Sequence, residues 1–160
     1  MDLATYLLRK HEKNYHDYIR QRLRQVGGFI QFIRNELGEF YKVKDLLHPL
    51  QFDLLTDSVK KYVTGEVPGR ERNSLALKLG TTFKAMAERL RGKSLRNSAN
   101  PESQELRRTT EAFLELYRSE WPDVVSSQCL KRMYDAKMNK QQEQYFNSQM
   151  SHLFLFNLLL

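Results

Sequence analysis

The chain has 160 residues, a formal net charge of +7, and only seven glycines and four prolines. So few turn-forming residues exclude an all-β fold, and the length suits one domain with its own apolar core. A single cysteine, the lack of a secretory signal at the start and the lack of about 18 consecutive apolar residues argue against a disulfide-bonded, secreted or membrane-spanning protein, so we expect a nuclear or cytoplasmic one.

The first strong helical pattern extends from Tyr15 to Leu37, where apolar residues recur in steps of four and three. This spacing places them on one face of an amphipathic helix. Residues 1–14, which precede it, are expected to form a helical arm or tail. Two adjacent glycines, Gly27 and Gly28, interrupt the pattern and predict a kink or the close packing of a neighbouring helix.

Three further helices are predicted in the middle of the chain. The second begins near Pro49 and ends at Gly65, and the third extends from Ser74 to Gly92, each with apolar residues at helical spacing. The stretch GKSLRNSAN (92–100) is expected to form a flexible basic loop. A cap, a first-turn proline and a first-turn acid follow one another in Asn100-Pro101-Glu102, which predicts the start of a fourth helix that Pro122 ends.

The last predicted helix has Ser126 or Ser127 as its N-cap and ends near Ala136. Five amphipathic helices with short loops predict an all-α bundle over residues 15–138. Residues 139–160 form a tail that is first polar and then apolar, ending in LFLFNLLL. Because an exposed apolar tail favours aggregation, we expect either that the chain is a truncated product or that the tail docks on the bundle or mediates self-association.

No catalytic or metal-binding pattern is present in the sequence. The four histidines lack Cys, Asp or Glu neighbours at the spacing of metal ligands, so we expect no zinc or iron site and no cofactor. Cys129 has no histidine close in sequence, and Gly92-Lys93-Ser94 lacks the upstream glycine and the preceding strand of a phosphate-binding loop. The sequence therefore predicts a protein that is not an enzyme and that has no small-molecule substrate.

The positive charge is concentrated in the middle of the chain. Between Lys60 and Arg96 there are ten basic residues and three acidic ones, an excess that is typical of proteins that bind a polyanion. Because arginine can hold phosphates with two hydrogen bonds, we expect contacts with DNA phosphates at low sequence specificity. The candidate contact residues are Arg20, Arg24, Lys84, Arg89, Arg91, Lys93 and Arg96. The alternative is a solvated basic surface without a partner.

Three segments resemble a known family in their content and order: YIRQRLRQVGGFI (18–30), SLALKLG (74–80) and LYRSEW (116–121). They are similar to transposon-derived animal proteins related to tyrosine recombinases of the phage-integrase superfamily. The resemblance covers residues 15–140 and corresponds to the helical core-binding segment, which in integrases clamps DNA ahead of the catalytic domain. It therefore implies a non-catalytic DNA-binding domain. No catalytic domain follows in this chain, and no tyrosine here can be assigned the role of nucleophile.

Two other interpretations are compatible with the sequence. One is a helical bundle that binds another protein through the apolar tail or the Gly27-Gly28 helix. The other is a non-functional remnant of a longer gene, which would fold poorly.

Overall fold

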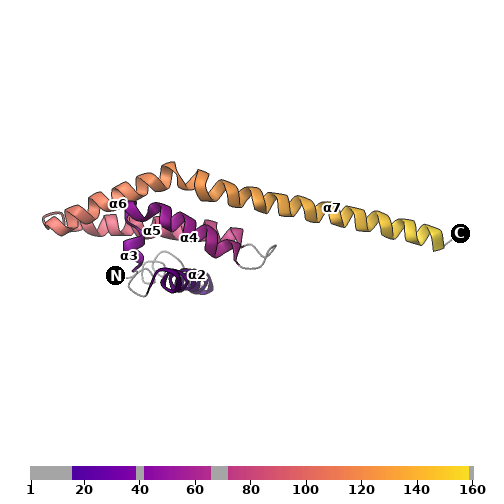
Figure 1. Ribbon diagram of the computed structural model, residues 1–160, viewed down its shortest axis with the longest axis horizontal. Helices are drawn as coiled ribbons and strands as arrows, with labels where there is room; N and C mark the ends of the chain where they lie inside the picture. Colours follow the sequence, from indigo (N-terminus) through magenta and orange to yellow (C-terminus); the bar gives the residue numbers. More distant parts are fainter. Residues whose placement is uncertain (1–15, 39–41, 66–71, 159–160) are drawn as a thin grey trace.

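The structure, a computed structural model, describes residues 16–38, 42–65 and 72–158, and over 147–158 it describes the backbone alone. These residues form an all-α bundle with five long helices, so the predicted fold class is confirmed (Figure 1). The expected arm over residues 1–14 lies outside the described residues. The elements in chain order are α2 (His16–Leu37), α3 (Val43–Leu46), a 3-10 turn (Pro49–Gln51), α4 (Phe52–Thr64), α5 (Asn73–Arg96), α6 (Pro101–Ser119), a π-helical turn (Pro122–Ser126) and α7 (Ser127–Leu158).

Helix α5 is the centre of the bundle and contacts α2, α4, α6 and the start of α7. Its apolar residues fall in steps of four, so that Leu75, Leu79, Phe83 and Ala87 are all buried on one side of the helix. The Phe83 ring lies 5.4 Å from the ring of Phe29 on α2, measured between ring centroids. The contact between Phe83 and Phe29 therefore connects α2 to the central helix α5.

Trp121 is the largest fully buried side chain and sits where α6 meets the π-helical turn. Its indole stacks on Tyr117 at 5.1 Å and meets the edges of Phe52 and Phe83 at 6.5 and 6.3 Å. A Cβ atom at Gly80 would lie 2.6 Å from the indole Nε1, so the absence of a side chain there lets the indole lie against α5. Burial, with a smaller contribution from the carboxylate of Glu88, raises the pKa of Tyr117 to about 12.

The π-helical turn joins α6 to α7 with a bend that is visible in Figure 1. Pro122 lacks an N–H group, and its ring would clash inside a regular α-helix. The wider π-helical turn accommodates the proline. The N–H groups of Asp123 and Val124 both donate to the carbonyl of Glu120, at 3.1 and 2.9 Å. Helix α6 ends at Ser119, slightly before the predicted end at Pro122.

The end predicted for the last helix is wrong, because α7 continues past Ala136 to Leu158. The segment 127–158 contains no glycine or proline and is rich in Lys, Gln, Met and Leu, which favour helix. The expected cap is also absent, since Ser127 Oγ donates to the carbonyl of Asp123 at 2.9 Å. Residues 139–158 are thus helical in the structure, where the sequence pattern had indicated a tail.

Two glycine-based predictions have different outcomes. Helix α2 continues through Gly27 and Gly28 without interruption, and a Cβ at Gly28 would lie 2.7 Å from the Tyr62 hydroxyl, so the prediction of close packing is confirmed. Helix α5, in contrast, passes Gly92 and ends at Arg96. The stretch 92–96 is therefore helical, and the connection to α6 is shorter than the basic loop that we expected.

Arg22 ties α2 to α5 through a hydrogen-bonded guanidinium group. Its Nη1 lies 2.8 Å from the carbonyl of Lys78, 2.7 Å from Thr81 Oγ1 and 2.5 Å from Thr82 Oγ1. Its Nε and Nη2 donate to the hydroxyl of Tyr18 at 2.9 and 2.7 Å. All three nitrogens of the planar guanidinium group take part in these contacts. Arg22 therefore has a structural role, which is to hold α2 against α5.

Replacing Gly80 should destabilise the bundle strongly. In Gly80→Ala the new methyl group meets the Trp121 ring, and we expect a loss of about 1–3 kcal/mol in the free energy of unfolding. The control is Gly92→Ala in the same helix, where a Cβ meets no atom within 4 Å and where alanine should stabilise by up to about 1 kcal/mol. Urea unfolding followed by circular dichroism measures both. Equal stability of the two variants would contradict the packing described.

The substitution Arg22→Lys keeps the positive charge but replaces the planar guanidinium group with a single amine. It should lower the free energy of unfolding by about 1–2 kcal/mol, because a lysine cannot reach the threonine and tyrosine hydroxyls together. Arg24→Lys on the exposed face of the same helix should change it by less than about 0.5 kcal/mol. Thermal unfolding of the two variants is the test, and a similar effect of both would argue against the structural role of Arg22.

Candidate nucleic-acid interface

The seven predicted DNA-contacting residues lie on two helices. Arg20 and Arg24 are on α2, where both are exposed on the side away from its buried residues Ile19 and Val26. Arg20 also forms an exposed ion pair with Asp17 at 3.3 Å, an interaction that contributes little to stability. The side of α2 that faces α5 carries Arg22. Arg20 and Arg24 therefore lie on a separate, outward-facing surface of α2.

The other five predicted residues are on α5 and fall into two groups. Lys84 and Arg91 are seven residues apart, and so are Arg89 and Arg96, which places each pair on one side of the helix. Lys84 and Arg89 differ by five residues, a rotation of about 140°, so the two pairs lie on different sides. Lys93 is close to the second pair. The structure therefore does not bring all seven predicted residues onto one surface.

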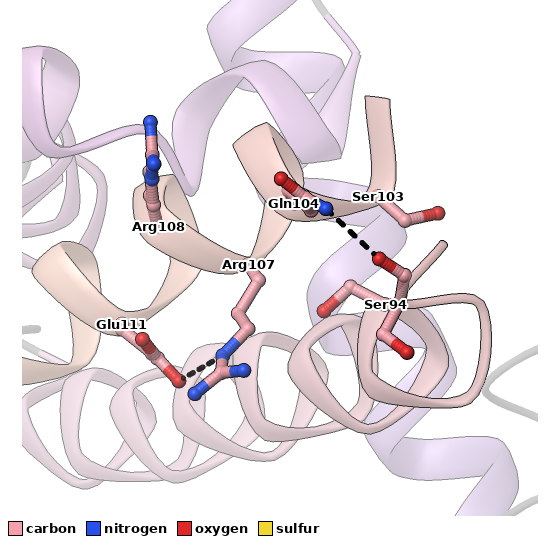
Figure 2. A pocket seen from close by; sticks show the side chains of 7 residues that line it. Ser94, Ser103, Gln104, Arg107, Arg108 and Glu111 are labelled. Atoms are coloured by element: carbon pink, nitrogen blue, oxygen red, sulfur yellow. Dashed lines mark hydrogen bonds and ion pairs between the residues drawn. The ribbon is translucent and has the colours of Figure 1, made fainter. Parts of the chain in front are cut away.

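A pocket of about 430 Å³ lies between the end of α5 and the first turns of α6 (Figure 2). The two helices form a hairpin with a short connection, so the last turn of α5 lies beside the first turns of α6. Polar side chains surround the pocket. They are Ser94, Ser98, Ser103, Gln104, Arg107, Arg108 and Glu111.

The side chains around this pocket are partly bonded to one another. Arg107 Nε donates to Glu111 Oε1 at 2.9 Å, and Gln104 Nε2 donates to the carbonyl of Ser98 at 3.1 Å. Figure 2 shows Arg107 and Arg108 pointing to opposite sides of α6. Ser94 is buried, and its hydroxyl donates to the carbonyl of Arg91 at 2.7 Å. The pocket thus has two arginines that each pair with a glutamate, together with hydroxyl and amide groups.

The start of α6 fixes one side of the pocket, and it follows the predicted pattern. Asn100 Oδ1 accepts a hydrogen bond from the N–H of Glu102 at 2.9 Å, and Pro101 is the first helical residue. The cap, the proline and the acid therefore have the roles that the sequence indicated. Because the helix starts here, Ser103, Gln104 and Arg107 lie in its first two turns, beside the end of α5.

This end of the hairpin has an excess of positive charge. Residues 89–111 contain six basic and three acidic side chains. Arg91, Lys93 and Arg96 form no ion pair with any residue that the structure describes, whereas Arg107 pairs with Glu111 and Arg108 lies 4.0 Å from Glu105. We name as the basic end the group Arg91, Lys93, Arg96, Arg107 and Arg108, which lie at one end of the hairpin but on more than one side of it.

Two members of the basic end, Arg107 and Arg108, are absent from the sequence prediction. They were overlooked because the fourth helix is acidic as a whole, with Glu102, Glu105 and Glu111 around them. The signal was nevertheless present in the short connection between the two predicted helices. A connection of a few residues makes antiparallel neighbours, which brings the start of one helix beside the end of the other.

The described residues contain no group of three or more His, Cys, Asp or Glu side chains arranged to hold a metal ion. Within the same residues, no helix is both long enough and apolar enough to cross a membrane. Cys129, at the start of α7, is buried.

The sequence matches no protein-family model, no curated protein and no solved structure. The resemblance to tyrosine recombinases therefore depends on the three sequence segments alone.

Proposed function

We propose that this domain binds DNA without catalysing a reaction on it, and that the basic end contacts the phosphate backbone. The observation that carries the proposal is the position of Arg91, Lys93 and Arg96, which have no acidic partner among the described residues. The pocket at the same end of the hairpin is lined with serine hydroxyls and with Arg107 and Arg108. The resemblance to the core-binding segment of tyrosine recombinases supports the same function, and a DNA partner would agree with a nuclear location.

The chemistry of the basic end fits phosphate oxygens better than bases. Guanidinium groups bind phosphates with two parallel hydrogen bonds, and hydroxyl and amide groups supply further donors. Such contacts give affinity without selecting a base sequence, so the binding should depend strongly on salt. The proposal places the contact at the end of the α5–α6 hairpin. Arg20 and Arg24 lie on a separate surface and remain predictions from the sequence.

A second candidate function, the binding of another protein, has a different observation in its favour. Helix α7 leaves the bundle, and large apolar side chains are exposed along it. An apolar surface of this kind on a helix is typical of a protein contact. Self-association through residues 151–160 remains a hypothesis from the sequence. A poorly folding remnant is less compatible with the buried aromatic core around Trp121.

Fluorescence anisotropy with a random-sequence DNA duplex tests the DNA proposal. Between three and five phosphate contacts should make log affinity fall with log salt at a slope of about −2.7 to −4.5. The triple variant Arg91→Ala/Lys93→Ala/Arg96→Ala should flatten the slope by about 2 to 3, because three cations no longer release counterions. Circular dichroism of the variant checks that the helices are intact.

The matched control removes the same charge from a distant helix. Lys131, Lys137 and Lys140 are exposed on α7 and form no ion pair with a described residue. Their replacement by alanine should leave the slope nearly unchanged. An equal effect of both triple variants would mean that net charge, and not the basic end, drives binding. No binding at low salt would overturn the proposed function.

A further inference from the structure

Helix α7 extends beyond the rest of the bundle as a single projecting helix (Figure 1). All side chains from Leu130 to Phe146 are exposed, and several are large and apolar. Leu130 is 53% exposed, Tyr134 63% and Tyr145 69%. Polar residues alone would be expected on a helix that stays in water, so this part of α7 calls for a partner.

Four of the six large exposed apolar residues that the structure describes on α7 lie on one face of the helix, and Met133 and Phe146 lie off it. We name as the α7 seam the residues Leu130, Tyr134, Met138, Gln141 and Tyr145, which follow one another in steps of four, four, three and four. This spacing keeps them on one side of an α-helix, and the 11-residue repeat that it contains suits nearly straight helices.

The seam faces away from the bundle. Cys129 is buried and therefore marks the side of α7 that packs on the other helices. From Cys129, the positions of Tyr134, Met138 and Tyr145 are rotated by about 140° to 180° around the helix. A second helix can therefore lie along the seam without meeting the bundle.

We propose that the α7 seam pairs with the α7 seam of a second copy of this chain, with the two helices parallel. A buried aromatic side chain covers about 150–250 Å², so Tyr134 and Tyr145, exposed by about two thirds, offer roughly 200–350 Å² per copy. Two copies with Leu130 and Met138 added approach the area of about 1,000 Å² that a specific interface needs. The seam is thus of a size that suits a small dimer interface.

A polar residue within the seam favours the parallel orientation. In a parallel pair in register, the Gln141 side chains of the two copies face each other and can form a hydrogen bond. An antiparallel pair with the seams fully overlapped would set Gln141 against Tyr134 instead.

This inference is independent of the proposed function and adds to it a second copy of the chain. In a parallel pair, the two bundles lie at the same end, on the outer sides of the paired helices. The basic ends lie far from the C-terminus of α7 (Figure 1). Both copies would therefore present their basic ends in the same direction.

Sedimentation velocity of the whole chain over a range of concentrations tests the pairing. The unmodified chain should form a dimer, and Tyr134→Ser/Tyr145→Ser should raise the dissociation constant by about 100-fold or more, because four aromatic contacts are lost per dimer. Asn139→Ser/Glu143→Ser on the opposite side of α7 is the matched control and should leave the dimer unchanged. Circular dichroism shows whether each variant retains its helices.

Two further variants test the orientation. Gln141→Cys should form a disulfide between copies under mild oxidation, because a parallel seam brings position 141 next to itself, and Glu143→Cys on the far side should not.

Several results would overturn the inference. A chain that stays monomeric at every concentration would do so. A dimer that survives Tyr134→Ser/Tyr145→Ser but is lost when residues 151–160 are deleted would place the contact in the tail. Equal cross-linking at positions 141 and 143 would exclude the parallel seam.

Discussion

The contact between Trp121 and Gly80 is the constraint on which the rest of this fold depends. The indole lies so close to α5 that no side chain fits at position 80, and Phe52, Phe83 and Tyr117 surround it. These three aromatic rings come from α4, α5 and α6, so Trp121 holds the three helices together. The same residue precedes the π-helical turn, and it thereby sets the point where the chain leaves the core.

Much of this fold could be predicted from periodicity, because buried faces repeat at helical spacing. The stripe on α5 and the start of α6 at Pro101 follow the sequence pattern closely. Helix ends were harder to predict. Gly92 is inside a helix because the cost of one glycine is about 1 kcal/mol, less than the packing of the turns around it contributes. The length of α7 was missed because residues 139–149 are mostly polar and resemble a polar tail.

The candidate site shows a different limit of sequence reasoning. Charge density identified α5 as the basic helix, but a sequence does not tell on which side of the helix each cation lies. Arg22, Arg20 and Arg24 occur together in one short segment, yet Arg22 bonds to α5 while the other two face outward. Arg107 and Arg108 join the α5 cations only because the hairpin folds back. The pocket at this end is thus a property of tertiary packing, which local charge counts do not contain.

The π-helical turn at Pro122 has a mechanical consequence for α7. The helix has 32 residues, which at about 1.5 Å per residue makes a lever about 48 Å long. A tilt of about 10° at its base would displace the far end by about 8 Å. The base of this lever is seated on Trp121, so the aromatic cluster determines both how the core closes and where the distant end of the molecule points.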